Sequence, residues 1–191
     1  MKILTGSLKG KTLSFKPNPY LRPTSDKVRK AIFDMLQGQV RDKRVLDLYS
    51  GTGALGFEAL SCGAAQAVFV EKDKKQCDKI EGGLVQLGLA GRGQVLCLDA
   101  VRAVGIFADQ GDYFDIVFLD PPYQSGEGLK CLETLAKSSL LHTETLIFLE
   151  CLRREKPPNR QGKLRRVKDK LYGDTRILVY RPCDTAQSAS D

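Results

Sequence analysis

Between residues 44 and 150, short apolar runs alternate with stretches in which apolar residues recur at helical spacing. The runs are nearly continuous, which is typical of strands in a parallel sheet with helices on both faces. Right-handed crossovers through the intervening helices join such strands into one sheet. The pattern therefore predicts an α/β fold with a doubly wound, mostly parallel sheet. The expected strands are 45–49, 67–71, 94–98, 116–119 and 145–150, and the expected helices are 54–62, 74–87, 100–108 and 128–138.

A smaller element is expected at the N-terminus. Residues 2–5 and 11–15 favour a short β-hairpin, because glycines lie between them. Thr24 or Ser25 can cap the helix that follows, which ends near Gly38.

A second hairpin is expected near the C-terminus. Residues 164–171 and 176–180 predict two antiparallel strands that turn at Gly173 and Asp174, after a basic link over 153–161. The expected divisions of the chain are a basic N-terminal extension over 1–40, a core over 41–182 and a flexible tail over 183–191.

Length and composition narrow the class of protein. The 191 residues suit one domain, and 42% hydrophobic with 28% charged residues is an ordinary globular composition. No apolar run approaches the roughly 18 residues of a membrane span, and the first residues lack a signal peptide's apolar block. We therefore expect a cytoplasmic protein with no membrane partner.

The cysteines and the histidine point away from metal and triad chemistry. The six cysteines are scattered without a CxxC spacing, which favours reduced structural thiols over a disulfide framework or a metal site. His142, the only histidine, precedes an expected strand and is expected to be a solvated loop residue. No His-based catalytic triad can be built elsewhere.

The net charge of +7 is unevenly distributed. Residues 1–44 carry +8, residues 45–150 carry −7 and residues 151–191 carry +6. Basic stretches are often only solvated surface, but two of them around an acidic centre favour a polyanionic partner. The cations that could contact phosphates are Lys9, Lys11, Arg22, Lys27, Arg29 and Lys30 in the head, and Arg153, Arg154, Arg165, Arg166 and Lys168 in the tail.

A glycine-rich turn lies between the first expected strand and the first helix of the core. Gly51, Gly53 and Gly56 satisfy GxGxxG, and Glu71 ends the next strand 20 positions after Gly51. This is a dinucleotide fingerprint, in which glycines admit the ligand to the backbone and a carboxylate binds a ribose diol. A nicotinamide dinucleotide is therefore one candidate cofactor.

Two further acids favour S-adenosylmethionine instead. Asp47 lies inside the first strand, four residues before Gly51, where it suits an ammonium group better than a pyrophosphate. Asp99 ends the third strand, where an acceptor can bind an adenine amino group, although it could equally cap the following helix. Acids at three successive strand ends fit a cationic ligand better than a diphosphate.

The fourth expected strand runs into Asp120, Pro121, Pro122 and Tyr123. Open α/β sheets bind their ligands at this end of the strands. A carboxylate and a main-chain carbonyl can accept two N–H bonds from an exocyclic amine while the aromatic ring stacks on the base. The alternative is a rigid turn with a polar lip.

Together, these motifs resemble those of class I amino methyltransferases, which have a Rossmann-like fold. Residues 6–11, 21–24 and 27–36 are similar to the N-terminal signature of the RsmD family, and 171–175 to its final hairpin. The resemblance extends over residues 1–182. Residues 3–5 and Tyr49-Ser50 depart from the common family pattern without removing a functional group.

The resemblance implies an enzyme that uses S-adenosylmethionine to methylate a guanine N2 of bacterial 16S ribosomal RNA. The substrate would be the small ribosomal subunit or a late assembly intermediate, and the enzyme a monomer. Asp120 and the Pro121 carbonyl would accept the N2 hydrogens while Tyr123 holds the unstacked base.

The site residues implied are catalytic Asp120, Pro121, Pro122 and Tyr123; cofactor-binding Asp47, Tyr49, Ser50, Gly51, Thr52, Gly53, Glu71, Lys72, Asp99 and Ala100; and substrate-binding Arg22, Lys9, Lys11, Arg153 and Arg154, with no metal. The Asp-Pro-Pro-Tyr segment is shared with DNA adenine-N6 methyltransferases, which remain the first alternative. A nicotinamide-dependent oxidoreductase and a non-catalytic RNA-binding assembly factor are weaker ones.

Overall fold

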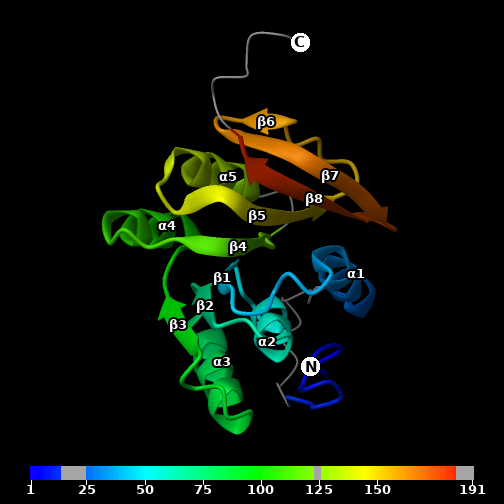
Figure 1. Ribbon diagram of the computed structural model, residues 1–191, viewed down its shortest axis with the longest axis vertical. Helices are drawn as coiled ribbons and strands as arrows, with labels where there is room; N and C mark the ends of the chain where they lie inside the picture. The colour runs from blue at the N-terminus through cyan, green and yellow to red at the C-terminus, as the bar shows by residue number, and fades with distance from the viewer. Residues whose placement is uncertain (14–24, 123–125, 184–191) are drawn as a thin grey trace.

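A computed structural model describes residues 1–13, 25–122 and 126–183 of the chain. These residues form one eight-stranded sheet with the strand order β3-β2-β1-β4-β5-β8-β7-β6 (Figure 1). The strands are β1 (Arg44–Leu48), β2 (Gln66–Glu71), β3 (Gly93–Cys97), β4 (Phe114–Leu119), β5 (Leu141–Leu152), β6 (Arg160–Gln161), β7 (Leu164–Tyr172) and β8 (Thr175–Pro182). The helices are α1 (Asp26–Leu36), α2 (Ala54–Ser61), α3 (Lys74–Gln86), α4 (Ala100–Asp109) and α5 (Glu127–Lys137).

Strands β1 to β5 are parallel, and β8, β7 and β6 extend the sheet in antiparallel fashion. This confirms the doubly wound, mostly parallel sheet and the C-terminal hairpin. The chain order reverses between β1 and β4, so the loops after these two strands diverge and leave a crevice at their carboxyl ends. The glycine turn follows β1 and the Asp120 turn follows β4, so both motifs lie at this crevice.

Helices cover both faces of the sheet because side chains alternate along each buried strand. Val117 points into the core shared with α4 and α5, whereas Phe118 points into the core shared with α1, α2 and α3. Figure 1 shows α4 and α5 on one side of the sheet and α1 and α2 on the other. Helix α1 therefore belongs to the same core as α2 and α3, although it precedes the division expected at residue 40.

The N-terminal segment folds back on itself, with the Ile3 N–H donating to the Lys11 carbonyl at 2.9 Å and the Leu13 N–H to the Met1 carbonyl at 2.8 Å, and it is also tied to α2. In the described part of the expected hairpin, residues 1–13, one antiparallel bridge pairs Lys2 with Thr12. The carboxylate of Glu58, 1% exposed in α2, accepts hydrogen bonds from the backbone N–H groups of Leu4 (2.7 Å) and Thr5 (3.0 Å). A buried carboxylate thus fixes the direction of the segment.

Helix α1 begins and ends as its sequence suggests. The Ser25 hydroxyl accepts a hydrogen bond from the Val28 N–H at 3.2 Å, and Gln37 ends the helix in the left-handed conformation. Arg29, however, does not face solvent. Its side chain is 3% exposed, and its Nε lies 3.2 Å from Glu58 Oε1. The expectation that Arg29 contacts phosphate is therefore wrong, because the side chain is used inside the core.

Two details of the second half differ from expectation. His142 lies in β5 and not in a loop, because β5 starts to pair with β4 at Leu141, opposite Phe114. Its Nε2 lies 3.3 Å from Asp115 Oδ1. The short strand β6 lies within the link expected over 153–161, where no strand was anticipated. The hairpin turn at Gly173 and Asp174 is confirmed.

All six cysteines are free thiols. No helix in the described ranges is long and apolar enough to cross a membrane. Over the same ranges, no three His, Cys, Asp or Glu side chains gather in a way that could hold a metal ion.

Candidate active site at the carboxyl ends of the strands

The glycine turn folds back on the ends of β1 and β2. Gly51 and Gly53 have φ of +55° and +74°, a backbone conformation that residues with a side chain rarely adopt. The Gly51 N–H donates to Glu71 Oε2 at 2.8 Å, and the Gly53 N–H donates to the Ser50 carbonyl at 2.7 Å. A Cβ on Gly56 would stand 2.2 Å from the Phe69 ring, so this glycine lets α2 pack against β2. Each glycine of the motif thus has a backbone or packing reason.

Asp47 is buried beneath this turn. Its side chain is 1% exposed, and Oδ2 accepts a hydrogen bond from the Gly56 N–H at 3.0 Å. Burial raises the pKa of Asp47 to about 8; the Gly56 hydrogen bond opposes the rise, and the carboxylates of Asp120 and Glu71 add to it. The carboxylates of Asp47, Glu71 and Asp120 therefore make the centre of the site electronegative, and a bound cation would favour ionised Asp47.

Glu71 and Lys72 form the rim beyond β2. Besides Gly51, the Glu71 carboxylate accepts a hydrogen bond from the Asp73 N–H at 2.9 Å. These two bonds fix its orientation and leave further lone pairs for a hydroxyl donor. The Lys72 ammonium is exposed and lies 3.9 Å from the carboxylate of Glu127, at the start of α5.

Asp99 has the capping role that was the alternative to cofactor binding. It is the N-cap of α4, and its Oδ1 accepts a hydrogen bond from the Arg102 N–H at 3.0 Å. The residue is exposed at the carboxyl end of β3. Ala100, the first residue of α4, is buried beside it.

Tyr49 and Thr52 connect the glycine turn to other parts of the site. Tyr49 has φ of +62°, an uncommon conformation for a residue other than glycine. Its hydroxyl donates to the Glu127 carbonyl at 3.3 Å, and burial raises the pKa of the phenol. The Thr52 hydroxyl lies 3.8 Å from the Met1 sulfur. The turn is thereby linked both to α5 and to the N-terminus.

The turn Asp120-Pro121-Pro122, called the acceptor turn below, follows directly on the end of β4. Asp120 follows Phe118 by two positions, so it is on the sheet face of α1 to α3, as is Asp47. Pro121 is buried and packs where a Cβ on Gly128 would approach its Cγ to 2.7 Å. Pro122 is exposed, and Tyr123 lies outside the described residues.

Glu150 is a site residue that sequence reasoning missed. Leu119 pairs with Leu149, so Glu150, still inside β5, lies level with Asp120, the residue after β4. Phe148 lies on the α1 side of the sheet, which puts Glu150 on the same face as Asp120, with 4% exposure. The signal was present, because Glu150 is also an acid near the end of an expected strand.

The expected substrate contacts are not all brought together. Arg153 and Arg154 are exposed just past β5, and the Arg153 N–H donates to the Asp174 carbonyl at 2.8 Å. Lys9 and Lys11 are exposed on the N-terminal segment, whose Ser7 N–H bonds to the Ser61 carbonyl at 2.8 Å.

Ser61 is the last residue of α2, so the tip of that segment, which carries Lys9, is separated from the glycine turn by the length of the helix. The eight residues of α2 span about 12 Å. Arg22 lies outside the described residues.

This sheet order, the glycine turn after β1 and the strand-end acids define the class I methyltransferase fold. A solved structure of SMU.776, described as a proposed methyltransferase and complexed with SAH, shares that fold with a TM-score of 0.66 at 16% identity, over 81% of this chain and 48% of that one.

The family model described as "Conserved hypothetical protein 95" matches residues 1–181, and the chain belongs to this family, the RsmD family. The Bacillus subtilis (strain 168) protein YlbH, named as a proposed rRNA methyltransferase, is 36% identical over 182 residues, covering 95% of this chain and 98% of that protein. Ribosomal RNA small subunit methyltransferase D of Escherichia coli (strain K12) is 31% identical over 191 residues, covering 100% and 93%. The solved Escherichia coli structure of yhhF, described as a proposed methyltransferase, superposes with a TM-score of 0.80 at 31% identity, covering 95% and 97%.

Proposed function

We propose that this protein transfers a methyl group from S-adenosylmethionine to the exocyclic N2 of a guanine in 16S ribosomal RNA. The observation that carries the proposal is the placement of the Asp120-Pro121-Pro122 turn beside an electronegative, glycine-lined crevice. Family membership and the full-length similarity to a small-subunit rRNA methyltransferase support it.

The residues of the crevice fit a cationic cofactor. The carboxylates of Glu71 and Asp120 add to the raised pKa of Asp47, so the crevice has a negative potential to which a sulfonium and an ammonium group would be attracted. A pyrophosphate would instead be repelled by the same carboxylates, which disfavours a nicotinamide dinucleotide. Asp47 and the Gly51–Gly53 turn would hold the amino acid end of the cofactor, Glu71 its ribose and Asp99 its adenine.

The cofactor supplies a methyl group on a positively charged sulfur, which is already electrophilic. The chain's own task is to present the acceptor nitrogen. The N2 lone pair of guanine is delocalised into the ring, so the amine must be held in a geometry that frees it. The Asp120 carboxylate and the Pro121 carbonyl would accept its two hydrogens, with Tyr123 stacked on the base.

The chain holds these acceptors in place before substrate arrives. Pro121 is restricted by its ring and buried against α5 at Gly128, and Tyr49 bonds the start of α5 to the glycine turn. Asp120 needs only to accept hydrogen bonds, because the methylated amine is cationic and loses its proton readily. Positioning and electrostatic preorganisation thus account for most of the catalysis.

The surface near the acceptor turn supports an RNA substrate. β8 pairs with β5 from Ile147–Tyr180 to Leu152–Thr175. The β7–β8 turn therefore lies at the carboxyl end of β5, the same end of the sheet as Asp120. Arg153, Arg154, Lys156, Lys168 and Lys170 are exposed on the link and on β7. These cations would contact phosphates on one side of the target, which must be unstacked to reach the turn.

The enzyme would act in the cytoplasm, as a monomer, on the small subunit or a late assembly intermediate. Labelled donor, purified protein and undermethylated small subunits test the function, with naked 16S RNA and adenine-containing DNA as parallel substrates. Label in N2-methylguanosine of the RNA is the expected result. Label only in DNA adenine would instead support an adenine-N6 methyltransferase, with which the Asp-Pro-Pro-Tyr segment is shared.

A further inference from the structure

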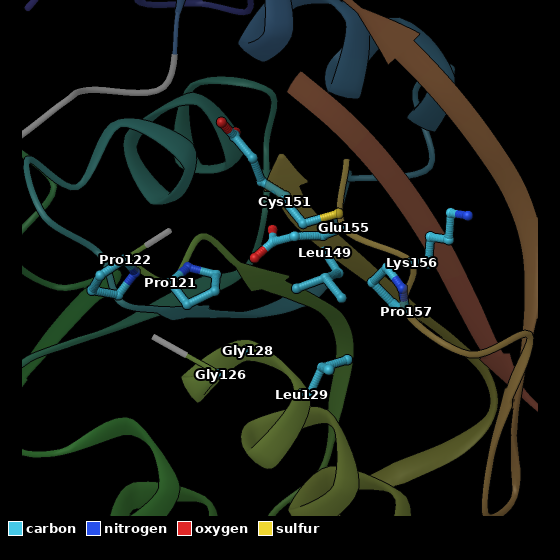
Figure 2. Close-up of a pocket in the computed structure, with 11 residues that line it drawn as sticks. Pro121, Pro122, Gly126, Gly128, Leu129, Leu149, Cys151, Glu155, Lys156 and Pro157 are labelled. Atoms are coloured by element: carbon cyan, nitrogen blue, oxygen red, sulfur yellow. The ribbon is translucent and has the colours of Figure 1, made fainter. Parts of the chain in front are cut away.

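We propose that a cavity beside the acceptor turn binds the nucleobase adjacent to the methylated guanine. The cavity has a volume of about 180 Å³ and lies between the acceptor turn, the start of α5, the end of β5 and the link that follows β5 (Figure 2). This inference rests on the proposed function and specifies a second part of the RNA that the protein holds.

The walls of the cavity suit the face of an aromatic base. Figure 2 shows Pro121 and Pro122 on one side, with Leu129, Leu149 and Pro157 around the rest of the lining. Small-molecule sites are mostly apolar with few polar groups, and single-stranded nucleic acids are held by stacking of base faces on such surfaces. The Leu129 side chain is 46% exposed, so one wall remains open to a ligand from solvent.

The outer wall is fixed by the C-terminal hairpin. Side chains of β7 and β8 donate to three carbonyls of the link: Arg176 Nη1 to Glu155 at 2.9 Å, Arg166 Nη1 to Pro157 at 3.4 Å and Tyr180 Oη to Pro158 at 2.7 Å. A link held at three carbonyls keeps its shape without a ligand. The cavity is therefore preformed, which reduces the ordering cost of binding.

Charge around the cavity favours a nucleotide over an apolar protein side chain. Lys156 lines the cavity, and Arg153 and Arg154 are exposed in the same link. Two carboxylates also line the cavity: Glu150 is 4% exposed, and Glu155 accepts a hydrogen bond from the Leu152 N–H at 2.7 Å. An apolar pocket with cations at its rim matches a flat base attached to a phosphodiester.

The position of the cavity identifies the nucleotide. Pro121 and Pro122 belong both to the acceptor turn and to the cavity wall, so a base in the cavity and the target base would lie on either side of the same turn. Of the nucleotides in the RNA, the direct neighbour of the target is joined to it by one sugar–phosphate unit. Holding that neighbour would keep the target out of its stack, which is the step that costs free energy.

The labelling assay described above identifies the methylated guanine. RNA fragments with an abasic site directly on its 5′ or its 3′ side then test this proposal. Affinity and methyl transfer are measured for the wild type, for Leu129→Glu at the mouth of the cavity, and for Val85→Glu on α3 as a matched control. Val85 is 72% exposed and far from the cavity along the fold, so its variant should behave like the wild type.

One of the two abasic fragments should bind the wild type about 5- to 100-fold more weakly than the intact fragment does, as expected for loss of one stacked base. Leu129→Glu should lose a similar factor on intact RNA, and the abasic site should then cost it nothing further. If neither abasic site matters to the wild type, or if Leu129→Glu still discriminates between the fragments, the cavity does not hold a neighbouring base.

Failure of the proposed function would look different, because the wild type would then transfer no methyl group to intact RNA or subunits. Thermal unfolding of each variant shows whether it is folded. The comparison of abasic and intact RNA on the wild type decides the proposal even if Leu129→Glu does not fold.

Discussion

The two basic ends of the chain carry similar net charges, +8 over residues 1–44 and +6 over residues 151–191, but the structure uses them differently. At the N-terminal end, Arg29 of α1 is buried in the core, and the segment over residues 1–13 bonds to α2, with Lys9 at the end far from the glycine turn. At the C-terminal end, the hairpin carries exposed cations near the carboxyl ends of the strands, where Asp120 also lies. Segments of similar charge therefore differ in function according to how far their cations are buried and how close they lie to the site.

The largest effect should come from Arg29. Arg29→Ala leaves Glu58, 1% exposed, without its cation, and breaking a buried pair on one side costs about 3–5 kcal/mol of stability. Chemical denaturation measures the loss. The double variant Arg29→Met with Glu58→Gln should recover part of it, because glutamine removes the unpaired charge and keeps an acceptor oxygen for the Leu4 and Thr5 N–H groups. An unchanged midpoint for Arg29→Ala would show that the buried pair does not stabilise the fold.

At the other end of the comparison, Asp120→Ala should raise the activation free energy of methyl transfer by about 2–4 kcal/mol, as for other preorganised polar groups in active sites. Single-turnover rates on small subunits measure it. Asp120→Asn is the matched variant, because it keeps the shape and one acceptor oxygen and should lose less. Equal rates for Asp120→Ala and the wild type would remove Asp120 from the chemistry.

Reversing exposed charges should separate the two basic regions directly. The double variant Lys168→Glu and Lys170→Glu should weaken RNA binding by about tenfold or more and flatten its salt dependence, because each phosphate contact contributes to the slope. The matched variant Lys9→Glu with Lys11→Glu changes charge equally, away from the acceptor turn. A larger loss from the Lys9 and Lys11 variant would reverse the assignment of the RNA-binding surface.

The smallest effect concerns pH and Asp47. Burial raises the pKa of Asp47 from 3.8 to about 8, so the stability that its neutral form contributes is complete below pH 3.8, falls as the unfolded chain ionises, and is lost by about pH 8. The stability of Asp47→Asn relative to the wild type should therefore rise between pH 3.8 and about pH 8, and level off above it. The wild type should bind S-adenosylmethionine more tightly as pH rises, since a cation favours ionised Asp47, and Asp47→Asn should remove this rise. Calorimetry at pH 6 and pH 9 measures both, and parallel pH profiles for the two proteins would contradict the assignment.

Much of the fold follows from the sequence because a buried parallel sheet leaves strong patterns. The run expected over 45–49 is β1 (Arg44–Leu48), and the helix expected over 74–87 is α3 (Lys74–Gln86), each within a residue or two. Apolar periodicity reports on burial, and burial is what these elements share. The N-terminal hairpin left a weaker pattern, because its few cross-strand hydrogen bonds are supplemented by the distant carboxylate of Glu58.

Site residues were harder to anticipate where a side chain's role depends on distant partners. The acids Asp47 and Asp120 were identified from their positions at strand ends, but their mutual effect arises only when β1 and β4 lie side by side. Arg29 was assigned to the surface because nothing near it in the sequence indicates Glu58, 29 residues away. His142 lies in a polar stretch whose pairing with Phe114 depends on the sheet register.

Methyl transfer to undermethylated small ribosomal subunits, followed by mass spectrometric identification of the modified nucleoside, tests the central claim most directly. The wild type should form N2-methylguanosine at one position in 16S RNA, and Asp120→Ala should form little of it under the same conditions. Formation of a different methylated nucleoside, or none in RNA while the donor binds normally, would contradict the claim that this acceptor turn presents a guanine amine.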